Sequence, residues 1–249
     1  MKIMKYSINC IIELHNRNRK LGKEFKPKIQ DKEIIIKPSS ENENDLNIVI
    51  NTDEYVIDEI ELFLRKLAYL IVVIEELPVK DFRIRSIVNN ETGEKNAFGS
   101  LKISAKLEGY TSGHGGKIKI QELLENKELL ANTDINSDFN LIAQIFNDVL
   151  KEKSIISKYI LLYGILEILF EGNLKEITKW IKDNIRLEGI IIATDKRRRS
   201  KPFEHTIFTD IKDKISHWAF RKLPSAEIEK YLPHLQNLVR RKIICEYNL

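Results

Sequence analysis

The spacing of apolar residues changes character partway along this chain. Up to residue 137, short runs rich in isoleucine and valine alternate apolar and polar positions, as in residues 6–14; this is the period of a half-buried β-strand. From residue 138 onward the apolar residues recur every three or four positions, which is typical of amphipathic helices. The sequence therefore predicts an α+β protein, with a mixed α+β domain over residues 1–137 and an all-α bundle over residues 138–249.

The N-terminal domain is predicted to hold an antiparallel sheet and one helix. Strand patterns occupy residues 6–14, 33–37, 46–50, 82–88 and 100–107. Thr52 or Asp53 can cap a helix whose apolar positions continue at helical spacing until Pro78. A glycine-rich stretch at residues 111–116 predicts a flexible loop. A polar stretch at residues 132–137 then marks the domain boundary.

The C-terminal domain is predicted to be a helical bundle. Helical spacing covers residues 139–150, 155–170, 174–185, 205–222 and 226–244. The mostly short connections between these segments favour a bundle. Gly172 and Asn173 provide a stop after the second helix, and Pro233 is expected to kink or split the last one.

Composition excludes several classes of protein. Of the 249 residues, 43% are apolar and 31% are charged, which indicates a packed core and excludes a mainly disordered chain. The longest uncharged apolar run, Leu67 to Ile74, is far shorter than the roughly 20 residues of a transmembrane helix. The first residues lack the pattern of a signal peptide. We therefore expect a cytoplasmic protein with no membrane partner.

Neither a metal nor a cofactor is expected. Cys10 and Cys245 lie at opposite ends of the chain, and the five histidines are scattered, so no zinc spacing or disulfide framework exists. Residues 113–117 are glycine-rich, but Thr111 stands where a phosphate-binding loop has its first glycine and Ile118 where it has serine or threonine.

A basic segment is the clearest electrostatic feature. The chain as a whole has a net charge of only +4, whereas residues 196–222 hold nine basic and three acidic residues. Such a local excess attracts phosphate groups. The candidate RNA-binding residues are Lys196, Arg197, Arg198, Arg199, Lys201 and His205. The alternative interpretation is a solvated loop and helix face.

The helix predicted after this segment carries the candidate catalytic residues. At about 100° per residue, the apolar side chains of residues 207–219 share one arc, and His217 points away from it. Asp213 lies four residues before His217, so the two are expected on one helical face, where a carboxylate can orient an imidazole. Lys212 lies at the edge of the apolar arc. A histidine, a cation and a basic approach fit RNA cleavage by the RNA's own 2′-hydroxyl, for which the protein moves a proton and stabilises charge on phosphoryl oxygens.

The run Lys212-Asp213-Lys214-Ile215-Ser216-His217 resembles the signature of the HEPN superfamily, which has arginine, a polar residue, a short spacer and histidine. The helix of residues 158–170, which contains Glu167, is similar to one in the ApeA-like HEPN group. That resemblance covers roughly residues 138–244 and implies an all-α HEPN-like domain. Many HEPN proteins are metal-independent ribonucleases of toxin–antitoxin and phage-defence systems.

The resemblance implies roles for individual residues. His217 matches the family histidine, expected to act in proton transfer or phosphate positioning, and Asp213 matches the polar position. Lys212 stands where the family usually has arginine, so bidentate contact with phosphate is lost. Family ribonuclease sites join two such sets across a two-fold axis. We therefore expect a homodimeric endoribonuclease, a hydrolase of phage defence or toxin activity, with RNA as its substrate.

Two other interpretations stay open. The chain is alternatively a catalytically inactive HEPN-like module that binds RNA, a nucleotide or a protein, as Lys212 suggests. A third interpretation is a structural or regulatory protein whose N-terminal domain binds a ligand or a protein partner, for which the α+β first half and its glycine loop are the motivation.

Overall fold

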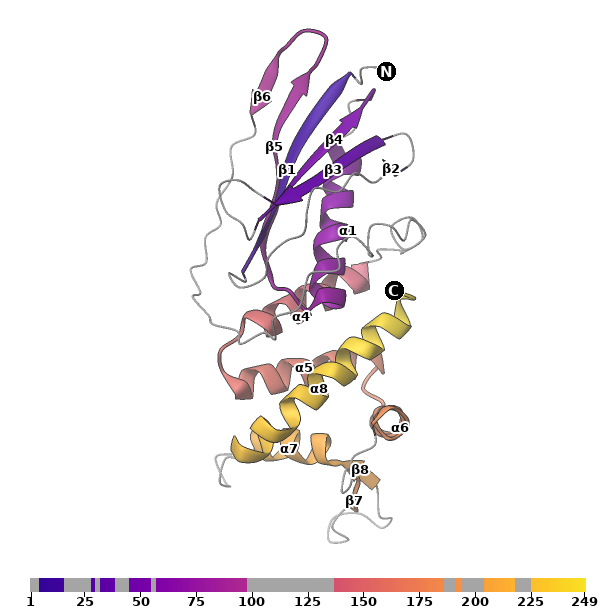
Figure 1. Ribbon diagram of the computed structural model, residues 1–249. Helices are drawn as coiled ribbons and strands as arrows, with labels where there is room; N and C mark the ends of the chain where they lie inside the picture. Colours follow the sequence, from indigo (N-terminus) through magenta and orange to yellow (C-terminus); the bar gives the residue numbers. More distant parts are fainter. Residues whose placement is uncertain are drawn as a thin grey trace. The chain divides into compact units, whose positions relative to one another are not determined.

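A computed structural model of the chain describes residues 5–15, 28–29, 32–38, 45–54, 57–97, 137–185, 191–193, 204–217 and 225–249. The chain divides into two compact units, Met1–Asn147 and Asp148–Leu249. Helix α4 (Ser137–Lys151) belongs to the first unit for most of its length, so the units divide ten residues beyond the boundary that the sequence predicts. The mixed α+β class and the mainly helical C-terminal part are as predicted (Figure 1).

The first unit is built on a six-stranded antiparallel sheet with the order β2-β3-β4-β1-β5-β6. The strands are β1 (Tyr6–Leu14), β2 (Lys28–Ile29), β3 (Lys32–Pro38), β4 (Leu46–Thr52), β5 (Val79–Asn89) and β6 (Lys95–Ala97). Four of the predicted strands are therefore confirmed. The predicted strand at 100–107 and the glycine-rich loop at 111–116 lie outside the described residues.

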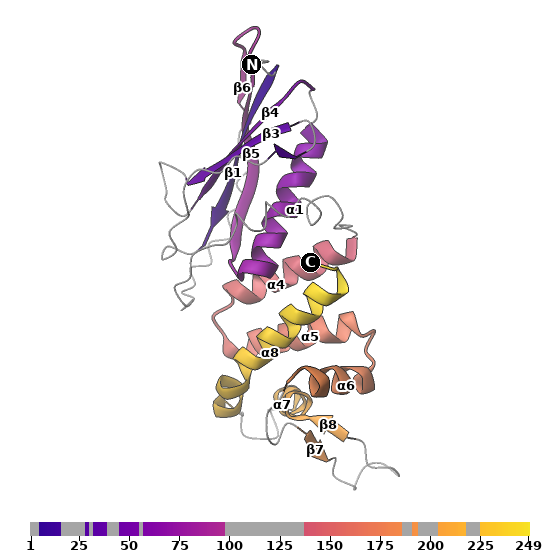
Figure 2. The same cartoon turned by 45° about the vertical axis from the view of Figure 1, so that its right-hand side comes forward.

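One face of the sheet is apolar and is covered by helix α1 (Ile57–Glu75), which runs along the sheet in both views (Figures 1 and 2). Ile8, Cys10 and Ile12 of β1 are buried and lie opposite isoleucine and leucine of β4. A bulge between Asn9 and Cys10 shifts the pairing with β5, because a bulge adds one residue to one strand. The helix begins later than a cap at Thr52 implies, since Thr52 is the last residue of β4.

Helix α4 is tied to the first unit by polar and aromatic contacts. The Asn147 side chain accepts a hydrogen bond from the Val79 N–H at 2.9 Å and donates one to the Val79 carbonyl at 3.0 Å. The Tyr69 ring of α1 meets the Phe82 and Phe139 rings edge to face, with centroids 6.3 and 6.4 Å apart. The start of β5 is thereby held to the C-terminal half of α4.

The second unit contains helices α5 (Ile155–Leu169), α6 (Leu174–Asn184), α7 (Ile207–Ser216) and α8 (Ser225–Glu246). It also contains a two-stranded antiparallel ribbon, β7 (Ile191–Ala193) with β8 (Glu204–Thr206). The ribbon was not predicted, and the helix predicted from residue 205 begins at Ile207, because His205 pairs with Ile192 in the ribbon. Pro233 lies inside a continuous α8, so of the two predicted effects, a kink or a split, the split does not occur. Buried residues on both sides of the proline hold the helix together.

None of the helices in the described segments combines the length and the apolar character that crossing a membrane requires.

We predict that Asn147→Ala lowers the free energy of unfolding by about 1–3 kcal/mol, because it leaves both polar groups of the Val79 main chain without their partner. Urea unfolding followed by circular dichroism measures the change. The neighbouring exposed Gln144→Ala is the control and is expected to change stability by less than about 0.5 kcal/mol. Equal effects of the two variants would contradict the role given to Asn147.

Candidate functional site

Helix α7 carries the predicted catalytic residues, and its start is fixed by a threonine cap. Thr206, the last residue of β8, has extended backbone geometry and accepts a hydrogen bond from the Thr209 N–H at 3.3 Å. The two threonine hydroxyls lie 3.2 Å apart, and both residues are buried. An N-cap side chain satisfies a main-chain N–H group that has no partner within the helix. Because Thr206 is both this cap and the last residue of β8, the ribbon leads directly into the helix.

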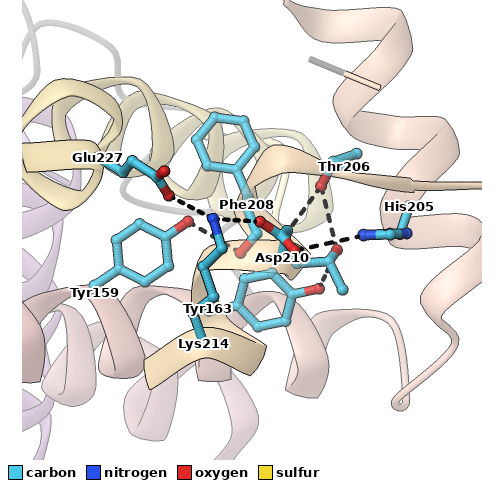
Figure 3. A network of polar contacts seen from close by, with 9 residues as sticks. Tyr159, Tyr163, His205, Thr206, Phe208, Asp210, Lys214 and Glu227 are labelled. Atoms are coloured by element: carbon cyan, nitrogen blue, oxygen red, sulfur yellow. Dashed lines mark hydrogen bonds and ion pairs between the residues drawn. The ribbon is translucent and has the colours of Figure 1, made fainter. Parts of the chain in front are cut away.

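Two buried tyrosines of α5 hold the first turn of α7 (Figure 3). The Tyr159 hydroxyl donates to the Phe208 carbonyl at 3.0 Å, and the Tyr163 hydroxyl lies 2.8 Å from Thr209 Oγ1. Both tyrosines are fully buried. Burial raises the pKa of both phenols, that of Tyr163 to about 12. These hydroxyls are thus neutral hydrogen-bonding groups that lock α5 and α7 together.

A row of charges lies beside these hydroxyls and joins α7 to α8. Lys214 Nζ is 2.9 Å from Asp210 Oδ2 and 2.9 Å from Glu227 Oε2 (Figure 3). The hydrogen bond to Glu227 is the main cause of a raised Lys214 pKa. This cluster was not predicted from the sequence. The four-residue spacing of Asp210 and Lys214 was a signal for their pairing, whereas nothing local indicated Glu227.

His205 lies on β8 and faces this charged row. Its Nε2 atom is 3.9 Å from Asp210 Oδ1, and its side chain is 14% exposed. Its Nδ1 atom is buried and has no hydrogen-bond partner among the residues described. Of the predicted RNA-binding residues, His205 alone falls within the described segments. Lys196, Arg197, Arg198, Arg199 and Lys201 lie outside them.

Lys212 is held by a carboxylate of α5. Its Nζ atom lies 3.2 Å from Glu167 Oε1 and 3.9 Å from Asp213 Oδ1. The same atom is 5.7 Å from the centroid of the Tyr163 ring, within the distance of a cation–π contact. Lys212 is half-buried. The candidate cation therefore has a defined position between α5 and α7, with its charge compensated.

His217 is the C-cap residue directly after α7, and it is exposed. It therefore points away from the core, as predicted. Its main-chain N–H donates to the Asp213 carbonyl at 3.1 Å. Its φ and ψ of −115° and 20° are no longer helical. The predicted helix to residue 222 therefore ends at Ser216, and residues 218–222 lie outside the described part.

The expected pairing of Asp213 with His217 is not formed. The Asp213 carboxylate instead has Lys212 as its ion-pair partner, and no ion pair joins it to the His217 ring in the described part of the chain. The reason is geometric, because four-residue neighbours face each other only while both belong to the helix. The site thus comprises a positioned cation, an exposed carboxylate and an exposed imidazole.

In the segments that the structure covers, no three histidine, cysteine, aspartate or glutamate side chains come together in a group that could hold a metal ion.

Comparison of the chain with models of protein families, with curated proteins and with solved structures finds no match. The site is therefore interpreted from its own geometry.

We predict that Tyr163→Phe flattens the alkaline loss of stability. The folded state keeps the Tyr163 proton up to about pH 12, whereas an unfolded tyrosine loses it near pH 10.0. Between these values the unfolded state binds fewer protons, so wild-type stability falls as pH rises, by up to about 1.4 kcal/mol per pH unit from this group. Phenylalanine cannot titrate, so the variant should decline less steeply.

Urea unfolding at a series of pH values from 8 to 12 measures both slopes. At pH 8 the variant should be less stable by about 1 kcal/mol, because the bond to Thr209 is lost. Parallel profiles for the two proteins above pH 10 would contradict this prediction.

Proposed function

We propose that the chain is a metal-independent endoribonuclease of the HEPN type that acts as a homodimer. The observation that carries the proposal is the exposed His217 at the end of α7, five residues after a cation held in place by Glu167. A helix anchored by two buried tyrosine hydroxyls presents both groups. Fixed positions matter because catalysis requires the reacting groups to be held in the correct geometry.

The reaction uses the RNA as its own nucleophile. The 2′-hydroxyl attacks the adjacent phosphorus and loses its proton, the bond from phosphorus to the 5′-oxygen breaks, and that oxygen receives a proton. The products are a 2′,3′-cyclic phosphate and a 5′-hydroxyl. Two proton transfers are needed, and a dimer supplies one His217 for each. Lys212 stabilises the charge that develops on the phosphoryl oxygens.

The basic segment supports RNA as the substrate. Lys196, Arg197, Arg198, Arg199 and Lys201 precede β8 and α7 in the chain, and such a cluster attracts a phosphate backbone without sequence preference. A role in phage defence or as a toxin follows from the HEPN resemblance alone, and it belongs to the proposal on that footing.

We predict that His217→Ala reduces RNA cleavage by at least about 100-fold, because it removes the group that transfers protons. The purified protein would be incubated with structured and unstructured RNA in EDTA, and the products resolved on a denaturing gel. His234→Ala is the matched control, since His234 is an exposed histidine of α8. If the wild-type protein cleaves no RNA, with or without an activating partner, the proposal that the chain is a ribonuclease is wrong.

The second candidate function is a catalytically inactive RNA-binding module. The ion pair of Lys212 with Glu167 favours it, because a compensated cation has less charge to offer a phosphate. Lysine also lacks the planar fork with which arginine binds phosphate at two points. In this alternative, the basic segment binds RNA and no bond is broken.

We predict that Lys212→Arg raises the cleavage rate, because a guanidinium can contact Glu167 and a phosphate oxygen together. Rates are measured beside Lys175→Arg, an exposed position of α6, which should leave the rate unchanged. Tight RNA binding without turnover in the wild type and in Lys212→Arg would select the binding module over the enzyme.

A further inference from the structure

Helix α5 exposes an apolar face around a glycine. Ile160 and Ile168 are 37% and 47% exposed, although most large aliphatic side chains of the second unit are buried. A Cβ atom added to Gly164 would meet no atom within 4 Å. At about 100° per residue, the two isoleucines lie roughly 40° to either side of Gly164. Among the described residues of the unit, α5 contacts α6, α7 and α8, and its buried side chains lie on the sides of the helix away from Ile160 and Ile168.

We propose that this face binds the same face of a second copy of the chain, with the two α5 helices antiparallel and the two-fold axis near Gly164. Because Ile160 and Ile168 are each four residues from Gly164, Ile160 of one protomer then packs against Ile168 of the other, twice. Such self-complementarity is what an isologous contact requires. Gly164 lets the two backbones approach closely at the axis, since it has no side chain.

The charges at the two ends of α5 favour the antiparallel arrangement. Near its N-terminal end lie the exposed Lys153 and the half-buried Lys158. Glu152 at this end accepts hydrogen bonds from the main-chain N–H groups of Lys153 and Ser154, which precede the helix, at 2.7 and 2.8 Å. The C-terminal end carries the exposed Glu171 and also Glu167, whose charge Lys212 compensates, and residues 159–172 include no basic residue. In an antiparallel pair, each basic end lies beside an acidic end.

This contact also brings the proposed cations of the two protomers to the same interface. Glu167, which holds Lys212 at 3.2 Å, is three residues from Gly164 and so about 4.5 Å from the axis along the helix. The Glu167–Lys212 pairs of the two protomers are then about 9 Å apart along that direction, which puts two cations on one RNA segment. The inference rests on the homodimer of the proposed function and names the surface that forms it.

Sedimentation equilibrium of the full chain tests the proposal. We expect a concentration-dependent dimer whose dissociation constant rises at least about tenfold in Ile168→Lys. Gly164→Leu should do the same by separating the backbones. Leu62→Lys and Leu141→Lys are matched controls, because these leucines are 54% and 52% exposed in the first unit. They should leave the dimer unchanged.

Gly164→Ala separates an interface effect from a folding effect. Alanine favours a helix over glycine, and the space for its Cβ is open in the single chain, so the melting temperature of the dilute protein should rise by about 2–8 °C. The dimer should nevertheless weaken. A variant that is more stable and less dimeric supports the proposal, whereas one that is more stable with an unchanged dimer overturns it.

Charge reversal provides an independent test. Lys158→Glu and Glu171→Lys should each weaken the dimer, and the double variant should recover part of the loss. A wild type that stays monomeric up to roughly 100 µM, or a dimer indifferent to every α5 substitution, overturns the inference. A dimer that cleaves no RNA would contradict the proposed ribonuclease activity and leave the proposed interface supported. Cleavage by a protein that stays monomeric would contradict the interface and leave the ribonuclease activity supported.

Discussion

The second unit depends on two tyrosine hydroxyls buried between α5 and α7. Tyr159 bonds to the Phe208 carbonyl and Tyr163 to the Thr209 hydroxyl, and these two partners are on consecutive residues. Two contacts on adjacent residues fix both the position of α7 along α5 and its rotation. A buried hydroxyl without a partner costs about 1–3 kcal/mol, so a rotated α7 would lose both bonds and pay that cost twice. The directions of all other side chains on α7 follow from this constraint.

Local periodicity was sufficient to predict much of this helix. Ile207, Phe208, Ile211 and Ile215 were expected on one apolar arc and are buried, and His217 was expected outside it and is exposed. The ends of the helix were not predictable in the same way. A start at Ile207 depends on a ribbon in which β8 pairs with a three-residue strand, and so short a strand has no clear pattern of its own. Strands β1, β3, β4 and β5 of the first unit were easier to predict, because each has seven or more residues. The short strands β2 and β6, with two and three residues, were not predicted.

The position of the Lys212 ammonium group could not be predicted from the sequence, for a different reason. Lys212 and Glu167 are on separate helices, 45 residues apart in the chain, and no local rule links them. Their ion pair is partly exposed, with 29% and 37% of the side chains accessible. A pair of that kind contributes at most about 1 kcal/mol. Glu167 therefore orients Lys212 without binding it so strongly that a phosphate could not replace the carboxylate. The same geometry thus suits both candidate functions. What separates them chemically is whether a lysine at position 212 can stabilise the phosphate as well as the planar guanidinium of an arginine would.

The weakest element of the proposed enzyme is the freedom of the His217 ring. Its main chain is fixed by the bond to the Asp213 carbonyl, but in the part of the chain that the structure describes no side chain orients the imidazole. An exposed ring samples several rotamers, and only some of them place the imidazole where it can transfer a proton. The rate enhancement that comes from positioning the reacting groups is therefore smaller. A second protomer or the RNA itself must then supply the orienting contact. The apolar face of α5 gives a separate reason for the proposed dimer, since Ile160 and Ile168 are exposed side chains of that helix. In the proposed dimer, catalytic geometry and packing each use the second copy of the chain, and they do so through different residues.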